Sequence, residues 1–130
     1  IVVTTPQLMA QKVATRVADM AKRSFIPLLG VIENMSYFES DSGDKYNIFG
    51  EGGGEALSDK FGIPLLGKVP ISENTNNVAD SGTPLIDQND SVTKVEIEKL
   101  INNIAIQLPP IIDETCTGRL AKVFEELSNQ

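Results

Sequence analysis

Three short apolar runs, separated by stretches of helical periodicity, constrain the fold of this chain more than any other feature. The runs occupy residues 1–5, 26–32 and 63–69, and their length and continuity are typical of strands covered on both faces. A helical stretch separates each run from the next, which is the order found in strand–helix–strand units. Because right-handed crossovers of this kind join parallel strands, the sequence predicts an α/β fold with a parallel sheet.

The two helical stretches between these runs are bounded by suitable residues. Pro6 suits the first turn of a helix predicted over residues 7–23. Gly62 suits the end of a helix predicted over residues 55–61, because glycine readily adopts the left-handed conformation. In the first helix, apolar side chains recur every three or four residues, and we expect the sheet to cover this stripe. The stripe consists of Met9, Val13, Val17 and Met20.

Helical signals continue after the third apolar run. Residues 72–80 predict a short helix, and residues 82–84 predict a turn. Residues 92–108 predict a longer helix that the following Pro-Pro pair ends, and Thr93 and Glu96 can form its capping box if the helix starts a residue or two late. The expected buried face of that helix consists of Ile97, Ile101, Ile104 and Leu108. Residues 117–129 predict a last helix whose stripe could pack back or meet a partner, and this stripe consists of Leu120, Val123, Phe124 and Leu127.

A hairpin is predicted between the second strand and the second helix. Gly43 and Asp44 suit a two-residue turn, and Tyr46 and Ile48 suit the returning strand. Carboxylates in this segment could in principle hold a hard cation through oxygen ligands, and a solvated hairpin is the simpler interpretation. These carboxylates belong to Glu39, Asp41 and Asp44.

Composition excludes several classes of function. The chain has 130 residues, a size that suits one domain or a piece of a larger one, and 18 acidic against 11 basic side chains give a net charge of −7. This balance argues against nucleic acid as a partner. No apolar stretch approaches the roughly 20 residues that cross a bilayer, so we expect no membrane span. A single cysteine and no histidine argue against disulfides and zinc sites, and we expect a cytoplasmic protein.

The first apolar run shows a strand already under way at residue 1. The chain opens on β-branched residues without an initiator methionine, and we therefore expect further sequence upstream.

Ligands of parallel α/β sheets bind beyond the carboxyl ends of the strands. This rule selects residues 4–6, 33–36 and 69–71. Asn34 is the best single candidate for a base contact, because its amide offers both a donor and an acceptor, and Pro70 and Ile71 could cover the faces of a base. The alternative is that Asn34 only ends a strand by bonding local backbone.

A glycine-rich segment at residues 50–54 precedes the second helix and could hold phosphate through backbone N–H groups. No Lys-Ser/Thr pair follows it, so it is not a P-loop. Glu51 and Glu55 would repel phosphate. We therefore expect a plain flexible turn.

Four segments occur in the order seen in one known family. They are Val-Val-Thr-Thr-Pro-Gln at residues 2–7, Gly-Val-Ile-Glu-Asn-Met-Ser-Tyr-Phe at 30–38, Ile-Phe-Gly-Glu-Gly-Gly at 48–53, and Pro-Leu-Leu-Gly-Lys-Val-Pro at 64–70. Together they resemble the Mrp family of P-loop ATPases, relatives of MinD and of the nitrogenase iron protein. The resemblance covers residues 1–108, which would form the C-terminal half of a Rossmann-like three-layer ATPase domain with a small β-hairpin insertion. Residues 109–130 would then be a C-terminal helical tail.

The resemblance implies an activity for the complete protein. Full-length members hydrolyse ATP, act as homodimers, and carry or insert iron–sulfur clusters for client apoproteins. Asn34 matches the asparagine that contacts adenine, and Val69, Pro70 and Ile71 match the segment on the other side of the base. The family places its phosphate loop and its Mg-coordinating Asp residues upstream of these segments. The binding of ATP with Mg would therefore also require that upstream part of the protein. The resemblance therefore assigns no catalytic residue and no metal ligand within these 130 residues.

The sequence departs from the family at the cluster-binding motif. Many members carry Cys-x-x-Cys just after the segment that residues 34–38 match, so that two chains share a cluster through thiolates. Here residues 39–43 read Glu-Ser-Asp-Ser-Gly. Cys116 lies far downstream, outside the resemblance, and a buried or incidental cysteine is the simpler interpretation.

Two functions therefore stand at this point. The leading one is the C-terminal part of an Mrp-like ATPase, which supplies the adenine side of the nucleotide site. The alternative is a truncated, non-catalytic binding module that acts through protein–protein contacts at a sheet edge or at its last helix.

Overall fold

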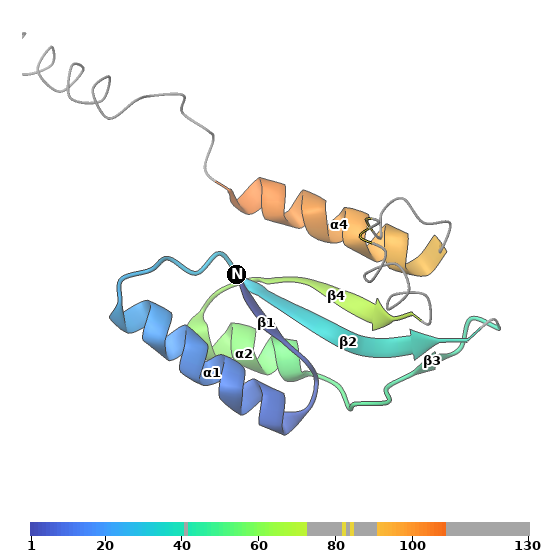
Figure 1. Ribbon diagram of the computed structural model, residues 1–130, viewed down its shortest axis with the longest axis horizontal. Helices are drawn as coiled ribbons and strands as arrows, with labels where there is room; N and C mark the ends of the chain where they lie inside the picture. The colour runs from blue at the N-terminus through green and yellow to red at the C-terminus, as the bar shows by residue number, and fades with distance from the viewer. Residues whose placement is uncertain (41, 73–81, 83, 85–90, 109–130) are drawn as a thin grey trace, which may run out of the picture.

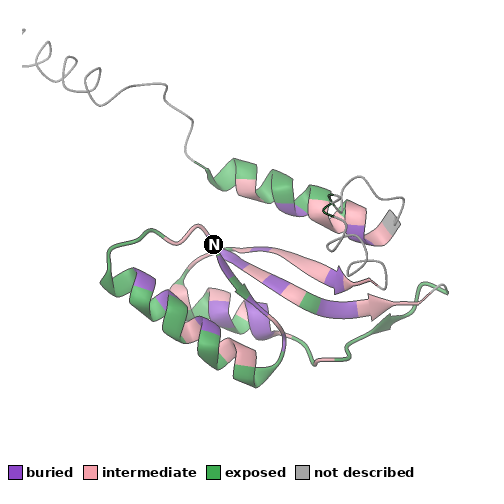
Figure 2. Cartoon of the chain, in the orientation of Figure 1, coloured by how far each residue is buried: buried purple, intermediate pink, exposed green. Residues whose placement is uncertain are grey.

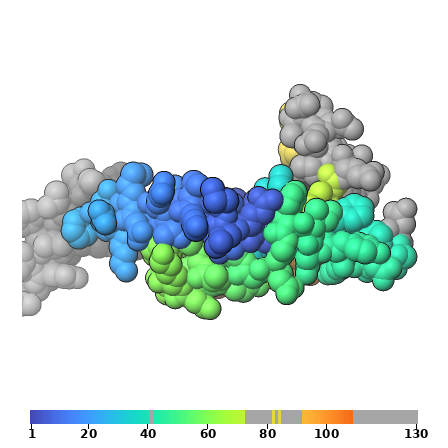
Figure 3. All heavy atoms as spheres, turned by 90° about the horizontal axis from the view of Figure 1, so that it is seen from below, coloured from blue at the N-terminus to red at the C-terminus, as the bar shows by residue number. Residues whose placement is uncertain are grey.

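The computed structural model of this chain describes residues 1–40, 42–72, 82, 84 and 91–108. Helices α1 and α2 lie on one face of a sheet and α4 lies on the other (Figure 1). Seen from the α1 and α2 side, these two helices lie next to each other over the strands (Figure 3). The elements in chain order are β1 (Val2–Thr4), α1 (Leu8–Arg23), β2 (Val31–Glu39), β3 (Lys45–Tyr46), α2 (Gly53–Phe61), β4 (Leu65–Ile71) and α4 (Ser91–Gln107).

The sheet is built around β2. Strands β1 and β4 pair with it in parallel, and β3 pairs with it in the antiparallel direction. Val31 lies opposite Val2 on one side and Leu65 on the other. The predicted α/β fold with a parallel sheet is confirmed, and so is the hairpin.

Strands β2 and β4 begin later than the apolar runs suggested. Residues 26–30 connect α1 to β2 and are not part of a strand, so the predicted strand at 26–32 was placed too early. Two backbone hydrogen bonds at the end of this connection hold the start of β2 between its neighbours. The carbonyl of Gly30 accepts the N–H of Val2, and the N–H of Val31 donates to the carbonyl of Pro64 at 2.9 Å. Prolines in both runs lack the N–H that a central strand needs, which explains the later start.

The buried face of α1 is not the predicted one. Ala14, Ala18 and Ala21 are buried, and the stripe formed by Met9, Val13, Val17 and Met20 is exposed. Figure 2 shows this exposed side of α1 along its length. Because alanine side chains are small, they let the helix approach the sheet closely, and the larger side chains are left on the outside.

The buried face of α4 also differs in part from the prediction. Thr93 and Leu100 are buried, and Ile101 and Leu108 are exposed. The helix begins at Ser91, so Thr93 lies inside it, and the late start that the capping box required does not occur. Glu96 pairs with Lys99 at 2.8 Å.

One side-chain hydrogen bond attaches α4 to the sheet. The Asn103 amide donates to the carbonyl of Leu66 at 2.8 Å. This bond fixes the helix over β4, the strand that α4 covers in Figure 1.

The core lies between the sheet and the α1–α2 layer. It consists of Val2, Ala14, Ala18, Val31 and Leu57, with Leu28, Phe61, Ile63 and Leu65 packed against it. Gly62 ends α2 with a φ of 65°, as predicted. The helix itself begins at Gly53, two residues before the predicted start.

The remaining predictions concern the hairpin turn and the segments after β4. The hairpin connection spans residues 40–44 instead of a two-residue turn, and Gly43 adopts a φ of 86° there. Gly82 lies in a turn with a φ of 72°. The helices predicted at 72–80 and 117–129, and Cys116, fall outside the described residues. Among the helices described, none is long and apolar enough to cross a membrane.

Candidate functional site

The three segments selected by the strand-end rule meet at one end of the sheet. Two of them end a strand as predicted, and the third does not. Strand β1 ends at Thr4 and β4 ends at Ile71, as that rule requires. Strand β2, in contrast, continues past Asn34 to Glu39, so the predicted end of this strand was wrong. Its course changes at Met35, whose φ is 55°, and the β2–β4 register shifts between Asn34 and Phe38. Asn34 therefore lies at an irregularity within a strand.

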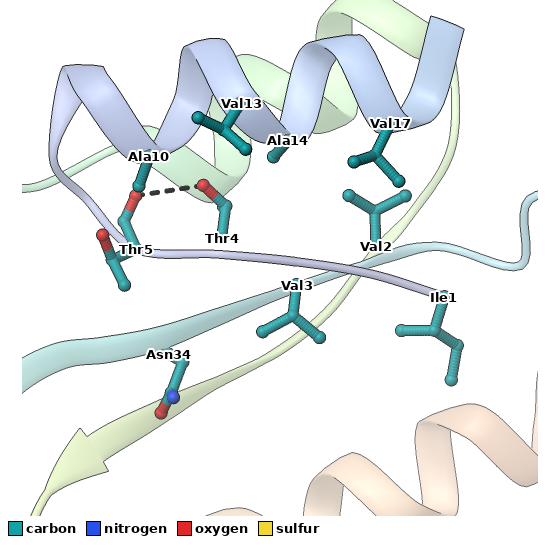
Figure 4. Close-up of a pocket in the computed structure, with 10 residues that line it drawn as sticks. All are labelled: Ile1, Val2, Val3, Thr4, Thr5, Ala10, Val13, Ala14, Val17 and Asn34. Carbon is teal, nitrogen blue, oxygen red and sulfur yellow. Dashed lines mark hydrogen bonds between the residues drawn. The ribbon is translucent and has the colours of Figure 1, made fainter. Parts of the chain in front are cut away.

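Asn34 is half-buried on the face of the sheet opposite α1 (Figure 4). Its Oδ1 accepts the N–H of Met35 at 3.0 Å, which is the local backbone bond of the alternative interpretation. Its NH2 group has no hydrogen-bond partner within the described part of the chain. A carboxamide oxygen has two lone pairs, so Asn34 keeps one acceptor position and two donors for a ligand.

Of the three predicted apolar neighbours of Asn34, one lies next to it and two lie further along β4. Val69 lies directly opposite Asn34 in the parallel pairing of β2 and β4. Ile71 lies opposite Phe38, beyond the register shift. Pro70, which lies between Val69 and Ile71 in β4, is buried. The structure thus brings Asn34 next to Val69, with Pro70 and Ile71 further along the same strand.

A groove also runs along the outer edge of β1. It has a volume of about 400 Å³ and an apolar lining from β1 and α1, with Asn34 at one side. Figure 4 shows Val13 and Val17 of α1 on one side of β1, and Ile1 and Val3 on the other side with Asn34. Val69, Pro70 and Ile71 do not line this groove, so it shares only Asn34 with the predicted base site.

Glu33 is a buried residue of β2 that the sequence motifs do not single out. Its side chain is 1% exposed, and both carboxylate oxygens are bonded. Oε2 accepts the N–H of Gly54 at 2.5 Å, and Oε1 accepts the Ser36 hydroxyl at 2.9 Å. The ammonium of Lys68 lies 3.8 Å from Oε1. An ionised carboxylate is tolerated in a core only with such partners, so a glutamate within an apolar strand is itself the signal of a fixed structural anion.

The glycine-rich segment is not a plain flexible turn. Gly53 and Gly54 are buried and form the first turn of α2. A Cβ at Gly53 would lie 2.8 Å from the carbonyl of Thr5, and one at Gly54 would lie 2.8 Å from Cβ of Glu33. Both glycines therefore allow close packing of α2 against the strand ends. Because the Glu33 carboxylate already occupies the anion position at this helix N-terminus, the segment is unsuited to phosphate.

A second pair of charges lies beside Glu33. Lys68 contacts the carboxylate of Glu55 at 2.5 Å. Burial opposes the charge of Glu55, but the hydrogen bond and attraction of Lys68 outweigh it and lower the pKa of this carboxyl. The hydrogen bond to Glu55 raises the pKa of Lys68, and the charge of Glu33 adds to this rise. These interactions keep Lys68 charged between two carboxylates.

The hairpin that replaces the cysteine motif is closed by hydroxyl groups. The Ser40 and Ser42 hydroxyls are bonded at 2.8 Å, and the Ser42 hydroxyl donates to the Asp44 carboxylate at 2.7 Å. The described part of the chain contains no thiol and no cluster of three metal-binding side chains. The residues present in this hairpin therefore do not fit a thiolate-ligated cluster.

Comparison with known proteins agrees with this fold. Residues 1–106 match the family model ParA, described as NUBPL iron-transfer P-loop NTPase. The iron-sulfur cluster carrier protein of Pyrococcus furiosus is 43% identical over 109 residues, which are 80% of this chain and 37% of that protein. The carrier protein of Deinococcus radiodurans is 45% identical over 87 residues, covering 66% of this chain and 24% of that protein. The chain thus spans less than half the length of these relatives.

Solved structures of P-loop proteins share this fold. The cell division ATPase MinD of Pyrococcus furiosus superimposes with a TM-score of 0.60 at 22% identity, covering 81% of this chain and 41% of that one. A nucleotide-binding protein of Archaeoglobus fulgidus, solved in complex with ADP, gives a TM-score of 0.51 at 33% identity, covering 60% of this chain and 32% of that one. On the match over residues 1–106, this chain belongs to the NUBPL iron-transfer P-loop NTPase family.

Proposed function

We propose that residues 1–108 form the C-terminal part of an ATP-hydrolysing iron–sulfur cluster carrier and supply the adenine side of its nucleotide site. The observation that carries this proposal is the pairing of Asn34 with Val69, which places an amide with free donors beside an apolar side chain. An Asn amide can bond the N6 amino group and a ring nitrogen of adenine together. Pro70 and Ile71 follow Val69 and would cover the base.

The phosphate chemistry of this function lies elsewhere. The 130 residues contain no Gly-x-x-x-x-Gly-Lys-Ser/Thr sequence, and the glycine-rich start of α2 already holds the Glu33 carboxylate. The phosphate loop and the Mg ligands would therefore come from polypeptide outside residues 1–130. We further propose that the complete protein serves iron–sulfur apoproteins, as the relatives' name, iron-sulfur cluster carrier protein, suggests. We also propose, from the resemblance alone, that it is a homodimer in the cytoplasm.

The adenine contact can be tested in a hybrid carrier, in which residues 1–106 of this chain replace the matched region of the Pyrococcus furiosus protein. Asn34→Ala should weaken ATP binding by about 1–3 kcal/mol, because the base loses a hydrogen-bonding partner that water cannot replace. This loss corresponds to a rise of roughly 5- to 150-fold in Kd. Isothermal titration calorimetry with ATP measures it.

Asn102→Ala is the matched control, because it removes the same side chain from an exposed position on α4. It should leave ATP affinity unchanged. Equal affinities of the Asn34→Ala and parent hybrids would refute the base contact.

Cluster binding is expected to be independent of the hairpin. Anaerobic reconstitution of the 130-residue chain with iron and sulfide should leave no cluster bound to residues 39–44, because hydroxyls and carboxylates stand where thiolates would be needed. Iron and acid-labile sulfide analysis provides the measurement. Glu39→Cys combined with Ser42→Cys, which restores a Cys-x-x-Cys, is the positive control. Stoichiometric iron and sulfide that survive Cys116→Ser in the otherwise unaltered chain would contradict the expectation.

A further inference from the structure

The backbone of β2 bends immediately after Asn34. From the pair that contains Asn34 to the pair that contains Phe38, β2 advances four residues (34 to 38) and β4 advances two (69 to 71), so β2 carries extra residues here. Met35 lies in this bend with a φ of 55°, in the left-handed region that residues with a side chain rarely adopt. Such a conformation persists only where neighbouring interactions hold it, and it is concentrated at ligand sites. The bend therefore needs an interaction that fixes it.

The hydroxyl of Ser36 closes this bend. Its oxygen lies 2.9 Å from the backbone carbonyl oxygen of Glu33 and 2.9 Å from Oε1 of the same residue, so the hydroxyl donates to two acceptors of Glu33. The bond to the carbonyl spans Asn34 and Met35 and joins the two ends of the bend. Ser36 is 4% exposed, so water cannot easily take the place of its hydroxyl.

The side chain of Glu33 anchors Ser36 to the rest of the fold. Its Oε2 accepts the N–H of Gly54 in the first turn of α2, and the ammonium of Lys68 lies 3.8 Å from Oε1. The carboxylate cannot turn to other partners without leaving the buried N–H of Gly54 unbonded. A continuous set of hydrogen bonds thus runs from the N-terminus of α2 through Glu33 to Ser36.

The orientation of the Asn34 amide depends on this bend. The amide lies on the face of the sheet opposite α1 (Figure 4), and its Oδ1 accepts the N–H of Met35 at 3.0 Å. The bend fixes the peptide plane that carries this N–H. If the bend opened, that peptide would rotate and the amide would lose the bond that orients it. A ligand that bonds a fixed amide does not bear the cost of ordering the side chain.

From these contacts, we infer that Ser36 is a positioning residue for the base: its hydroxyl holds the bend that keeps the Asn34 amide oriented toward adenine. The inference rests on the proposed function, because it concerns the same nucleotide site. The hydroxyl is buried and both of its acceptors belong to Glu33, so Ser36 acts through Asn34 and makes no contact of its own with the nucleotide.

Amide hydrogen exchange of Met35, followed by NMR in the 130-residue chain, tests whether Ser36 holds the bend. Asn34→Ala removes the acceptor of this N–H and defines the exchange rate of the free amide. Ser36→Ala should speed the exchange by about 5-fold or more, toward that rate. Ser58→Ala is the matched control, because its hydroxyl also donates to a backbone carbonyl, that of Ile63 at the other end of α2. It should leave the exchange of Met35 unchanged.

ATP binding in the hybrid carrier tests whether the orientation matters for the nucleotide. Ser36→Ala should raise the Kd about 3- to 10-fold, because the amide must then be ordered when the base binds. In the Asn34→Ala background the same substitution should have no further effect, because the side chain that Ser36 positions is gone. Isothermal titration calorimetry on the parent, the two single variants and the double variant measures this non-additivity. Ser58→Ala should leave the Kd unchanged.

Three outcomes would overturn the inference. One is exchange of Met35 that is as slow in Ser36→Ala as in the parent chain. Another is an unchanged Kd for Ser36→Ala where Asn34→Ala weakens binding. The third is a double variant in which the two losses of affinity multiply, as they would if Ser36 only stabilised the fold.

Failure of the proposed function would look different. An unchanged Kd for Asn34→Ala would refute the adenine contact, and the exchange of Met35 alone would then decide whether Ser36 holds Asn34. Should Ser36→Ala not fold, Ser36→Cys, which fills the same space with a weaker donor, takes its place with the same expectations.

Discussion

Glu33→Ala is expected to destabilise the chain by about 3 kcal/mol. The substitution removes a buried acceptor of two hydrogen bonds and leaves the N–H of Gly54 without a partner in the interior. It also removes the anion that faces the N-terminus of α2. Glu33→Gln should cost less, about 1–2 kcal/mol, because the amide oxygen can still accept one of the two bonds.

Urea unfolding followed by far-ultraviolet circular dichroism measures both effects, since the chain has no tryptophan to report by fluorescence. Glu98→Ala is the matched control, because Glu98 lies exposed on α4, and it should change the free energy of unfolding by less than about 0.5 kcal/mol. If Glu33→Ala were as harmless as Glu98→Ala, the buried carboxylate would have no structural role.

Gly30→Ala should be similarly severe, at about 3 kcal/mol, which is the upper range for overpacking. An added Cβ would lie 2.6 Å from the carbonyl of Pro64 and 2.6 Å from Cγ of Leu66. The carbonyl of Pro64 cannot withdraw easily, because it accepts the N–H of Val31 where β2 begins. The strands would have to separate at the point where they start to pair.

Gly67→Ala provides the comparison for this prediction. Its Cβ would come nearest to Leu100, with Cδ1 at 3.1 Å, and rotation of that side chain can move this atom away. We expect a cost below about 1.5 kcal/mol in the same urea titration. Equal costs for the two variants would show that the contact with the Pro64 carbonyl does not limit the packing of β2.

The strands could be predicted from the sequence because their signal is local. Each apolar run is short, carries β-branched residues and is bounded by helical stretches, and the runs at 26–32 and 63–69 led to β2 and β4. Their starting residues could not be predicted, because the first hydrogen bonds of β2 depend on Gly30 and Pro64, which lie far apart in the chain.

The buried face of α1 shows how periodicity can select the wrong side of a helix. Both the valine–methionine stripe and the alanine stripe recur every three or four residues, and hydrophobicity favours the larger side chains. The sheet contacts Ala14 and Ala18 instead, because helices at close distance require small residues.

The candidate site was predictable only in part for a similar reason. The strand-end rule selected Asn34 and Val69, and the parallel register places them opposite each other. The role of Glu33 depends on Gly54, which lies 21 residues later, and no local pattern links the two. The change of direction at Met35 requires a positive φ in a residue that rarely adopts one, so the continuation of β2 could not be anticipated.

The left-handed residue in β2 also has a consequence for the dynamics of the sheet. Before Met35 the strand is held on both sides, by β1 and β4, and the core packs against it. After Met35, Ser36 and Tyr37 are buried and Phe38 still lies opposite Ile71 of β4, but the short strand β3, whose two residues are exposed, takes the place of β1. Because local opening is governed by buried contacts, the hairpin tip beyond Phe38 can fray and reclose while the rest of the sheet stays folded. Strand β2 would then stay folded past the change of direction at Met35, as far as Phe38.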